Sequence, residues 1–109
     1  MVITKAGEIL ETARQLVDGD RARTHGDTME NHACIAALWN AYMRLQLQRR
    51  GVDVPGAIFG SLDVATMMLL LKVARTVSGG EHNLDNYVDA AGYAAVAGEI
   101  AEHWHAWRK

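Results

Sequence analysis

Apolar residues recur at helical spacing in four segments of the chain, and helix-breaking residues separate these segments. The periodicity predicts helices over about residues 5–18, 29–49, 61–78 and 84–107. Thr4 and Ser61 are the predicted N-caps of the first and third segments, and glycines follow the end of each at Gly19 and Gly79. No segment alternates between apolar and polar residues as a strand would. The predicted fold is all-α, a four-helix bundle in one domain over residues 1–109.

Two of these segments carry expectations about which face is buried. Residues 31, 35, 38, 42 and 45 follow each other at spacings of four and three, so they share a face that we expect to point into the bundle. The run VATMMLLLKVA in the third segment is apolar nearly all round. That segment is therefore predicted to be the most buried helix.

Composition narrows the class of protein. A formal charge of −2 over 109 residues gives no sign of electrostatic binding to nucleic acid. The only cysteine, Cys34, excludes an intramolecular disulfide and a zinc site built from cysteines. The longest apolar run, from Val64 to Leu71, is shorter than the ~20 residues that cross a bilayer. We expect a soluble, cytoplasmic protein with no membrane partner.

Two carboxylates open the last predicted helix in the stretch HNLDNYVDAAGYAAVAGEI. Asp85 and Asp89 lie one turn apart, on the strip that continues through Val96 and Ile100. Since two unpaired carboxylates at a buried face repel each other, a bound Mg²⁺ or Mn²⁺ would stabilise them. The structural alternatives are that Asp85 complements the helix dipole and that Asp89 forms an ion pair with Lys72 or Arg75.

Lys72 and Arg75 also lie about one turn apart, in the apolar third segment. They suit a phosphate clamp, with lysine as a point charge and arginine as a fork. The structural alternative is a helix C-terminus that carries basic residues, with the lysine stem buried and its ammonium in water.

The remaining candidates are polar or aromatic residues near the helix starts. Glu30 and Asn31 open the second predicted helix, and Asp63 opens the third, which an up-down bundle places at the opposite end. Asn31, Trp39 and Tyr93 would bind substrate by stacking or hydrogen bonding, or else serve only the fold. His25 and His32 would contact the phosphate or the metal, or else serve only the fold.

The blocks GDRARTHGDTMENH, IAALWNAY, DVATMMLLLKVAR and DNYVDAAGYAAVAGEIA occur in this order between about residues 18 and 102. Together they resemble a small phage-encoded family of helical proteins of unknown function. That family is similar to the MazG-like all-α NTP pyrophosphohydrolases. The chain departs from the pattern of these enzymes, because no E-x-x-D helix is present to pair with an E-x-x-E helix.

The resemblance implies a set of roles. Glu30, Asp85 and Asp89 would hold Mg²⁺ (or Mn²⁺) and act in catalysis, while Lys72, Arg75 and Asn86 would contact phosphates. The reaction would split a nucleoside triphosphate, NTP or dNTP, into the monophosphate and pyrophosphate, in a homodimer or homotetramer.

Three functions stay open at this point. The first is the metal-dependent pyrophosphohydrolase, acting on the nucleotide pool of a phage-infected host. The second is a non-catalytic helical module that binds a nucleotide or a protein, using the loop from Val52 to Phe59 and the Trp-rich tail from His103 to Lys109. The third is a purely structural oligomer.

Overall fold

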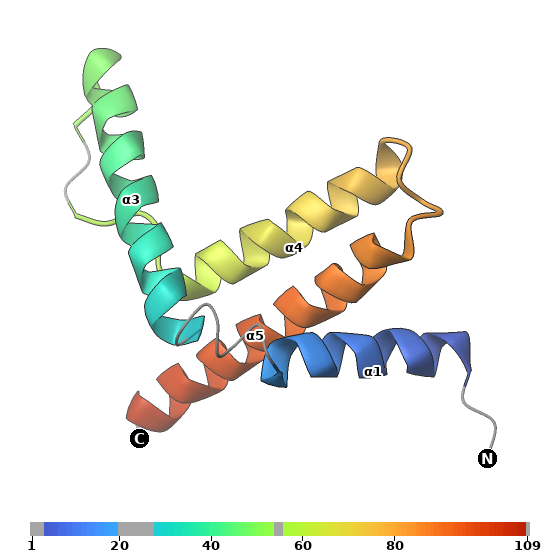
Figure 1. The fold of residues 1–109 in the computed structure, drawn as a ribbon. Helices are drawn as coiled ribbons and strands as arrows, with labels where there is room; N and C mark the ends of the chain where they lie inside the picture. Colours follow the sequence, from blue (N-terminus) through green and yellow to red (C-terminus); the bar gives the residue numbers. More distant parts are fainter. Residues whose placement is uncertain (1–3, 20–27, 54–55, 109) are drawn as a thin grey trace.

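The computed structural model describes residues 4–19, 28–53 and 56–108, with side chains described as far as His103. This part of the chain forms four helices and no strand (Figure 1). They are α1 (Lys5–Asp18), α3 (Thr28–Arg49), α4 (Ser61–Val77) and α5 (Leu84–Arg108). The all-α class and the positions of all four helices are confirmed. None of the described helices is long and apolar enough to span a membrane.

Helix α1 is bounded by local signals. The Thr4 hydroxyl accepts a hydrogen bond from the Gly7 N–H at 3.0 Å, as an N-cap does. At the other end the Gly19 N–H donates to the Gln15 carbonyl at 2.8 Å. A Cβ at Gly19 would collide with that same carbonyl oxygen, so only glycine fits there.

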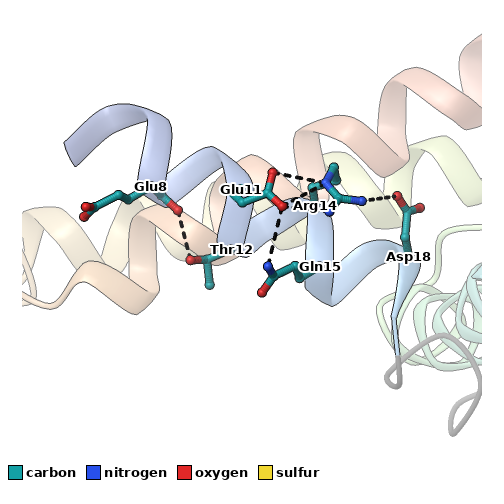
Figure 2. Close-up of polar contacts among 6 residues, drawn as sticks. All are labelled: Glu8, Glu11, Thr12, Arg14, Gln15 and Asp18. Carbon is teal, nitrogen blue, oxygen red and sulfur yellow. Dashed lines mark hydrogen bonds and ion pairs between the residues drawn. The ribbon is translucent and has the colours of Figure 1, made fainter. Parts of the chain in front are cut away.

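The outer face of α1 is polar (Figure 2). Arg14 donates to Glu11 at 2.7 Å and lies 3.8 Å from Asp18. The hydrogen bond from Arg14 lowers the pKa of the Glu11 carboxyl, and the pKa of Arg14 is raised in turn. These pairs are exposed and screened by water, so they mark the solvent side of α1 rather than stabilise the fold.

One side chain joins α3 to the segment that leads into α4. Asn40 accepts hydrogen bonds from the N–H groups of Ile58 (2.9 Å) and Phe59 (2.7 Å). Its amide also donates to the Phe59 carbonyl at 2.9 Å. The Phe59 ring meets Trp39 edge to face, with centroids 5.9 Å apart. The end of this loop is therefore fixed against the middle of α3.

The N-terminus of α4 explains Asp63. The N-cap is Gly60, one residue before the predicted Ser61, and the Asp63 carboxylate accepts from the Gly60 N–H at 2.8 Å. An acidic side chain at the third helical position commonly satisfies this donor. Asp63 therefore caps its own helix.

The helices pack around α5. Helices α4 and α5 run side by side in opposite directions, α1 packs along α5, and α3 crosses against α4 and projects away from the other three (Figure 1). The buried core cluster is small: Ala65, Val96 and Ile100, with Val17 and Met29 among the residues packed against it. The helix content agrees with a four-helix bundle, but the packing is more open than the expected up-down arrangement.

Two burial predictions were wrong for this reason. On α3, Leu38 is 71% exposed and Tyr42 65%, although both belong to the face expected to point inward. On α4, Val64 and Ala65 are buried, yet Leu70 is 57% exposed. A helix that is apolar nearly all round buries only the sides that other helices cover, and α3 and α5 leave part of α4 uncovered.

We predict that Asn40→Ala lowers the free energy of unfolding by about 1–3 kcal/mol, because it leaves two N–H groups and one carbonyl without their partner. Urea denaturation measures the change. Asn40→Asp keeps both accepted hydrogen bonds and should lose less. Gln48→Ala, exposed on the same helix, should stay within about 0.5 kcal/mol of wild type. Equal stability of Asn40→Ala and Gln48→Ala would contradict the role assigned to Asn40.

Candidate functional site

A pocket of about 270 Å³ lies where the four helices converge. Helix α1 contributes Ala13, Leu16 and Val17, and α5 contributes the strip that runs through Asp89 and Val96. The lining residues come from all four helices: Ala13, Leu16, Val17, Thr28, Asn31, His32, Ile35, Trp39, Met68, Val88, Asp89, Gly92, Tyr93, Val96.

The walls of the pocket are mostly apolar, and two aromatic rings stand among them. Trp39 comes from α3 and Tyr93 from α5, and both are partly buried. The edge-to-face contact with Phe59 restrains the Trp39 ring. Apolar walls with a few polar groups are typical of pockets that bind small molecules.

Four polar side chains line the same pocket: Thr28, Asn31, His32 and Asp89. Asn31 is exposed, as a residue at the rim of a pocket would be, whereas His32 is buried and Asp89 half-buried. Three of the residues predicted to bind substrate, Asn31, Trp39 and Tyr93, are thus brought together with Asp89. Sequence reasoning had offered His32 only as a contact to phosphate or metal.

Asp89 forms an ion pair with Lys72 across the contact between α4 and α5. The Asp89 Oδ2 and Lys72 Nζ atoms are 2.8 Å apart, and the two side chains are only 22% and 13% exposed. A short, poorly solvated pair of this kind ties its two helices together, because either charge alone would lack a partner. The carboxylate that periodicity placed on the inward strip is therefore neutralised by a cation from the neighbouring helix.

The other predicted metal ligands lie apart from this pair. Glu30 is exposed in the first turn of α3, and Asp85 is exposed in the first turn of α5; neither lines the pocket. In the part of the chain that is described, no three His, Cys, Asp or Glu side chains are grouped so that they could hold a metal ion. The geometry does not fit a site of three carboxylates, so the metal stays a prediction from the sequence.

Two predicted phosphate ligands lie at the connection between α4 and α5. Asn86 is 5% exposed, and its amide donates to the Gly80 carbonyl at 3.0 Å. The Gly80 N–H donates to the Arg75 carbonyl at 2.8 Å, while Arg75 itself is exposed in the last turn of α4. A Cβ at Gly80 would come within 2.6 Å of the Asn86 amide, so this turn needs glycine. Asn86 thus holds the turn together.

Other predicted residues fall outside the described part of the chain. His25 lies in the gap between residues 19 and 28, and the side chains of the tail are not described beyond residue 103. Apart from Thr28, the pocket residues that sequence reasoning did not select, such as Leu16, Ile35 and Met68, are apolar. Their only signal was membership of an apolar helical face, which does not separate a pocket wall from a filled core.

Comparison with known proteins places the chain among phage proteins. A family model described as "Domain of unknown function (DUF6378)" matches residues 8–101. The Gene 55 protein of Mycobacterium phage L5 is 48% identical over 88 residues, which cover 81% of this chain and 49% of that protein. The Gene 55 protein of Mycobacterium phage D29 is 34% identical over 94 residues, covering 86% and 54%. The chain spans about half the length of these curated relatives, and no solved structure matches it.

We predict that Asp89→Asn lowers the stability of the ligand-free protein by about 1–3 kcal/mol, because it leaves the Lys72 ammonium poorly solvated and without its counter-charge. Thermal or urea unfolding in chelated buffer measures the effect. Asp85→Asn, four residues earlier on the same helix and exposed, is the matched control and should change little. A variant Asp89→Asn that melts above wild type would instead indicate repulsion among carboxylates.

Proposed function

We propose that this chain, which belongs to the phage-encoded DUF6378 family, binds a nucleoside triphosphate with its nucleoside part in the pocket between the four helices. The observation that carries the proposal is the combination of two aromatic rings, polar side chains and apolar walls in one pocket beside Lys72. Its volume of about 270 Å³ is just below the ~300–1,000 Å³ usual for ligand pockets. Such a pocket suits a base with its sugar better than a whole triphosphate.

The aromatic residues support binding of a base. Trp39 and Tyr93 reach the pocket from different helices, so a flat ring in the pocket would meet aromatic surface from α3 and from α5. Stacking of a base on an aromatic side chain contributes about 1–3 kcal/mol and tolerates any base. Stacking on Trp39 and Tyr93 therefore selects a nucleoside but not a particular base.

The phosphates would extend from the pocket towards Lys72. The Lys72 ammonium lies 2.8 Å from Asp89, and Asp89 lines the pocket, so Lys72 is the cation adjoining the pocket wall. Arg75 follows about one turn later on α4 and is exposed. A triphosphate would compete with Asp89 for the Lys72 ammonium, because both are anionic hydrogen-bond acceptors.

The second candidate function is metal-dependent hydrolysis of the bound nucleotide to the monophosphate and pyrophosphate, as in MazG-like enzymes. The observation in its favour is the position of Asp89 at the pocket, with Asp85 one turn earlier on α5. Mg²⁺ or Mn²⁺ would supply Lewis-acid activation of a phosphoryl group. Because the described carboxylates do not form a cluster of three, binding alone is the function that the geometry supports better.

We also propose that a second copy of the chain covers the exposed apolar surface of α3 and α4. Leu38, Tyr42 and Leu45 form one stripe on α3, and Leu70, Val73 and Val77 form one on α4, each 45% exposed or more. The radius of gyration is 16.6 Å, against about 13 Å for a compact domain of this length. Stripes at spacings of three and four residues are what a partner helix packs against, which supports a homodimer or a higher oligomer.

We predict that nucleoside triphosphates raise the melting temperature of the wild-type protein, since a ligand at about 100 times its Kd adds about 2.7 kcal/mol of stability. Gly92→Leu should abolish the shift, because Gly92 lines the pocket and a longer side chain would occupy it. Gly98→Leu is the matched control: Gly98 lies on the same helix, is exposed and has nothing within 4 Å of an added Cβ. An equal shift in both variants would place the nucleotide elsewhere.

Pyrophosphate release in the same samples, with Mg²⁺ or Mn²⁺ and with chelator, separates the two candidate functions. Turnover that needs the metal and is lost in Asp89→Asn would favour hydrolysis. Binding without turnover would favour the non-catalytic module.

We predict that the wild-type protein is a dimer or larger in solution and that Leu45→Glu or Leu70→Glu shifts it to the monomer. Each change places a charge on an apolar surface that the second copy would bury. Light scattering after size exclusion measures the mass. Leu10→Glu, a matched change at a residue of α1 that is 63% exposed, should leave the mass unchanged. A wild-type protein that stays monomeric at all concentrations contradicts the proposal.

A further inference from the structure

His32 is the polar side chain whose surroundings constrain it most. It is 6% exposed, and its Nδ1 atom lies 2.8 Å from the Thr28 carbonyl oxygen, one turn earlier on α3. A carbonyl oxygen only accepts hydrogen bonds, so Nδ1 must carry the proton of this pair. In the neutral imidazole this fixes the tautomer and leaves Nε2 with a free lone pair.

That lone pair has no partner. Among the described residues, His32 Nε2 is the only buried side-chain nitrogen or oxygen without a hydrogen bond. The contrast is Asn86, which is equally buried but donates to the Gly80 carbonyl. A buried acceptor without a donor destabilises the ligand-free fold, and such an atom in a native protein calls for an explanation.

The position of His32 offers an explanation for this unpaired acceptor. Its side chain lines the same pocket as Trp39, Asp89 and Tyr93. The Nε2 atom itself has no open surface in the ligand-free structure, so a ligand in the pocket would reach it by displacing a neighbouring side chain of the pocket wall. We infer that His32 Nε2 accepts a hydrogen bond from an N–H or O–H group of the bound nucleoside. The inference rests on the proposed nucleotide binding and adds a specificity-determining residue to it. The free lone pair makes His32 selective for a donor: a ligand that presents an acceptor at this point would leave both groups unsatisfied.

The donor has two possible sources, the edge of the base and a sugar hydroxyl, and the test distinguishes them. Calorimetry gives the Kd of wild type and of His32→Leu for whichever of ATP, GTP, CTP and UTP binds wild type most tightly. The same measurement is made with analogues of that nucleotide that each lack one donor. The 2′-deoxy and 3′-deoxy forms remove a hydroxyl, and forms without the exocyclic amino group or with a methylated ring nitrogen remove a donor of the base.

We predict that one analogue binds wild type at least about tenfold more weakly than its parent, and that His32→Leu binds parent and analogue alike. If every analogue binds wild type and His32→Leu more weakly than the parent nucleotide by the same factor, the role of His32 is overturned, although nucleotide binding itself still holds. If no nucleotide gives a binding heat with wild type, the proposed function fails and the inference fails with it. This outcome differs from failure of the inference alone, in which nucleotides still bind.

A second variant keeps the test decisive if His32→Leu does not fold. His32→Gln places an amide oxygen near the position of Nε2 and should retain part of the discrimination against the analogue. Without nucleotide, His32→Leu should melt about 4–8 °C higher for each kcal/mol gained by removing the unpaired acceptor. Wild-type discrimination in both variants would overturn the role of His32.

Discussion

The packing of α4 against α5 is the contact on which the other helices depend. It is fastened at two places by polar groups: Lys72 with Asp89 along the helices, and Asn86 with Gly80 at the turn that joins them. Helix α1 then packs along α5, and α3 packs against α4. Since a poorly solvated ion pair demands close approach of its two partners, it also fixes the register of the two helices in a way that apolar contacts alone do less strictly.

The pocket exists because the helices place few large side chains at the point where they meet. The largest fully buried side chains are Ile100 and Val64, and the rest of the core cluster is alanine and valine. Ala13 and Gly92 reach the point of convergence with almost no side chain, so the larger residues around them cannot close the space. The pocket is therefore the space that small residues leave where the four helices meet.

Local signals were readable from the sequence, whereas partnerships between helices were readable only in part. Thr4 and Gly19 mark the ends of α1 through hydrogen bonds to nearby residues, so the sequence suffices there. Periodicity correctly put Asp89 on a partly buried strip, and Lys72 or Arg75 was named as its ion-pair partner, but only the packing of α4 against α5 selects Lys72. The same limit explains Leu38 and Tyr42: a shared face was correctly recognised, yet nothing in the spacing says whether another helix covers it. The sequence around His32 gave no sign that this side chain is buried, because its burial arises from helices distant in the sequence.

Because α3 crosses α4 and projects away from the other helices, its two halves differ in how many buried contacts they make. Its buried residues, His32 and Ala36, lie in its first half, and beyond Asn40 no residue of the helix is fully buried. Stability within a protein follows the local density of buried contacts, so amide hydrogens of the second half exchange through openings that leave α4 and α5 intact. Three helices thus pack against one another, and the second half of α3 is held mainly through Asn40 and the Trp39–Phe59 contact at its start.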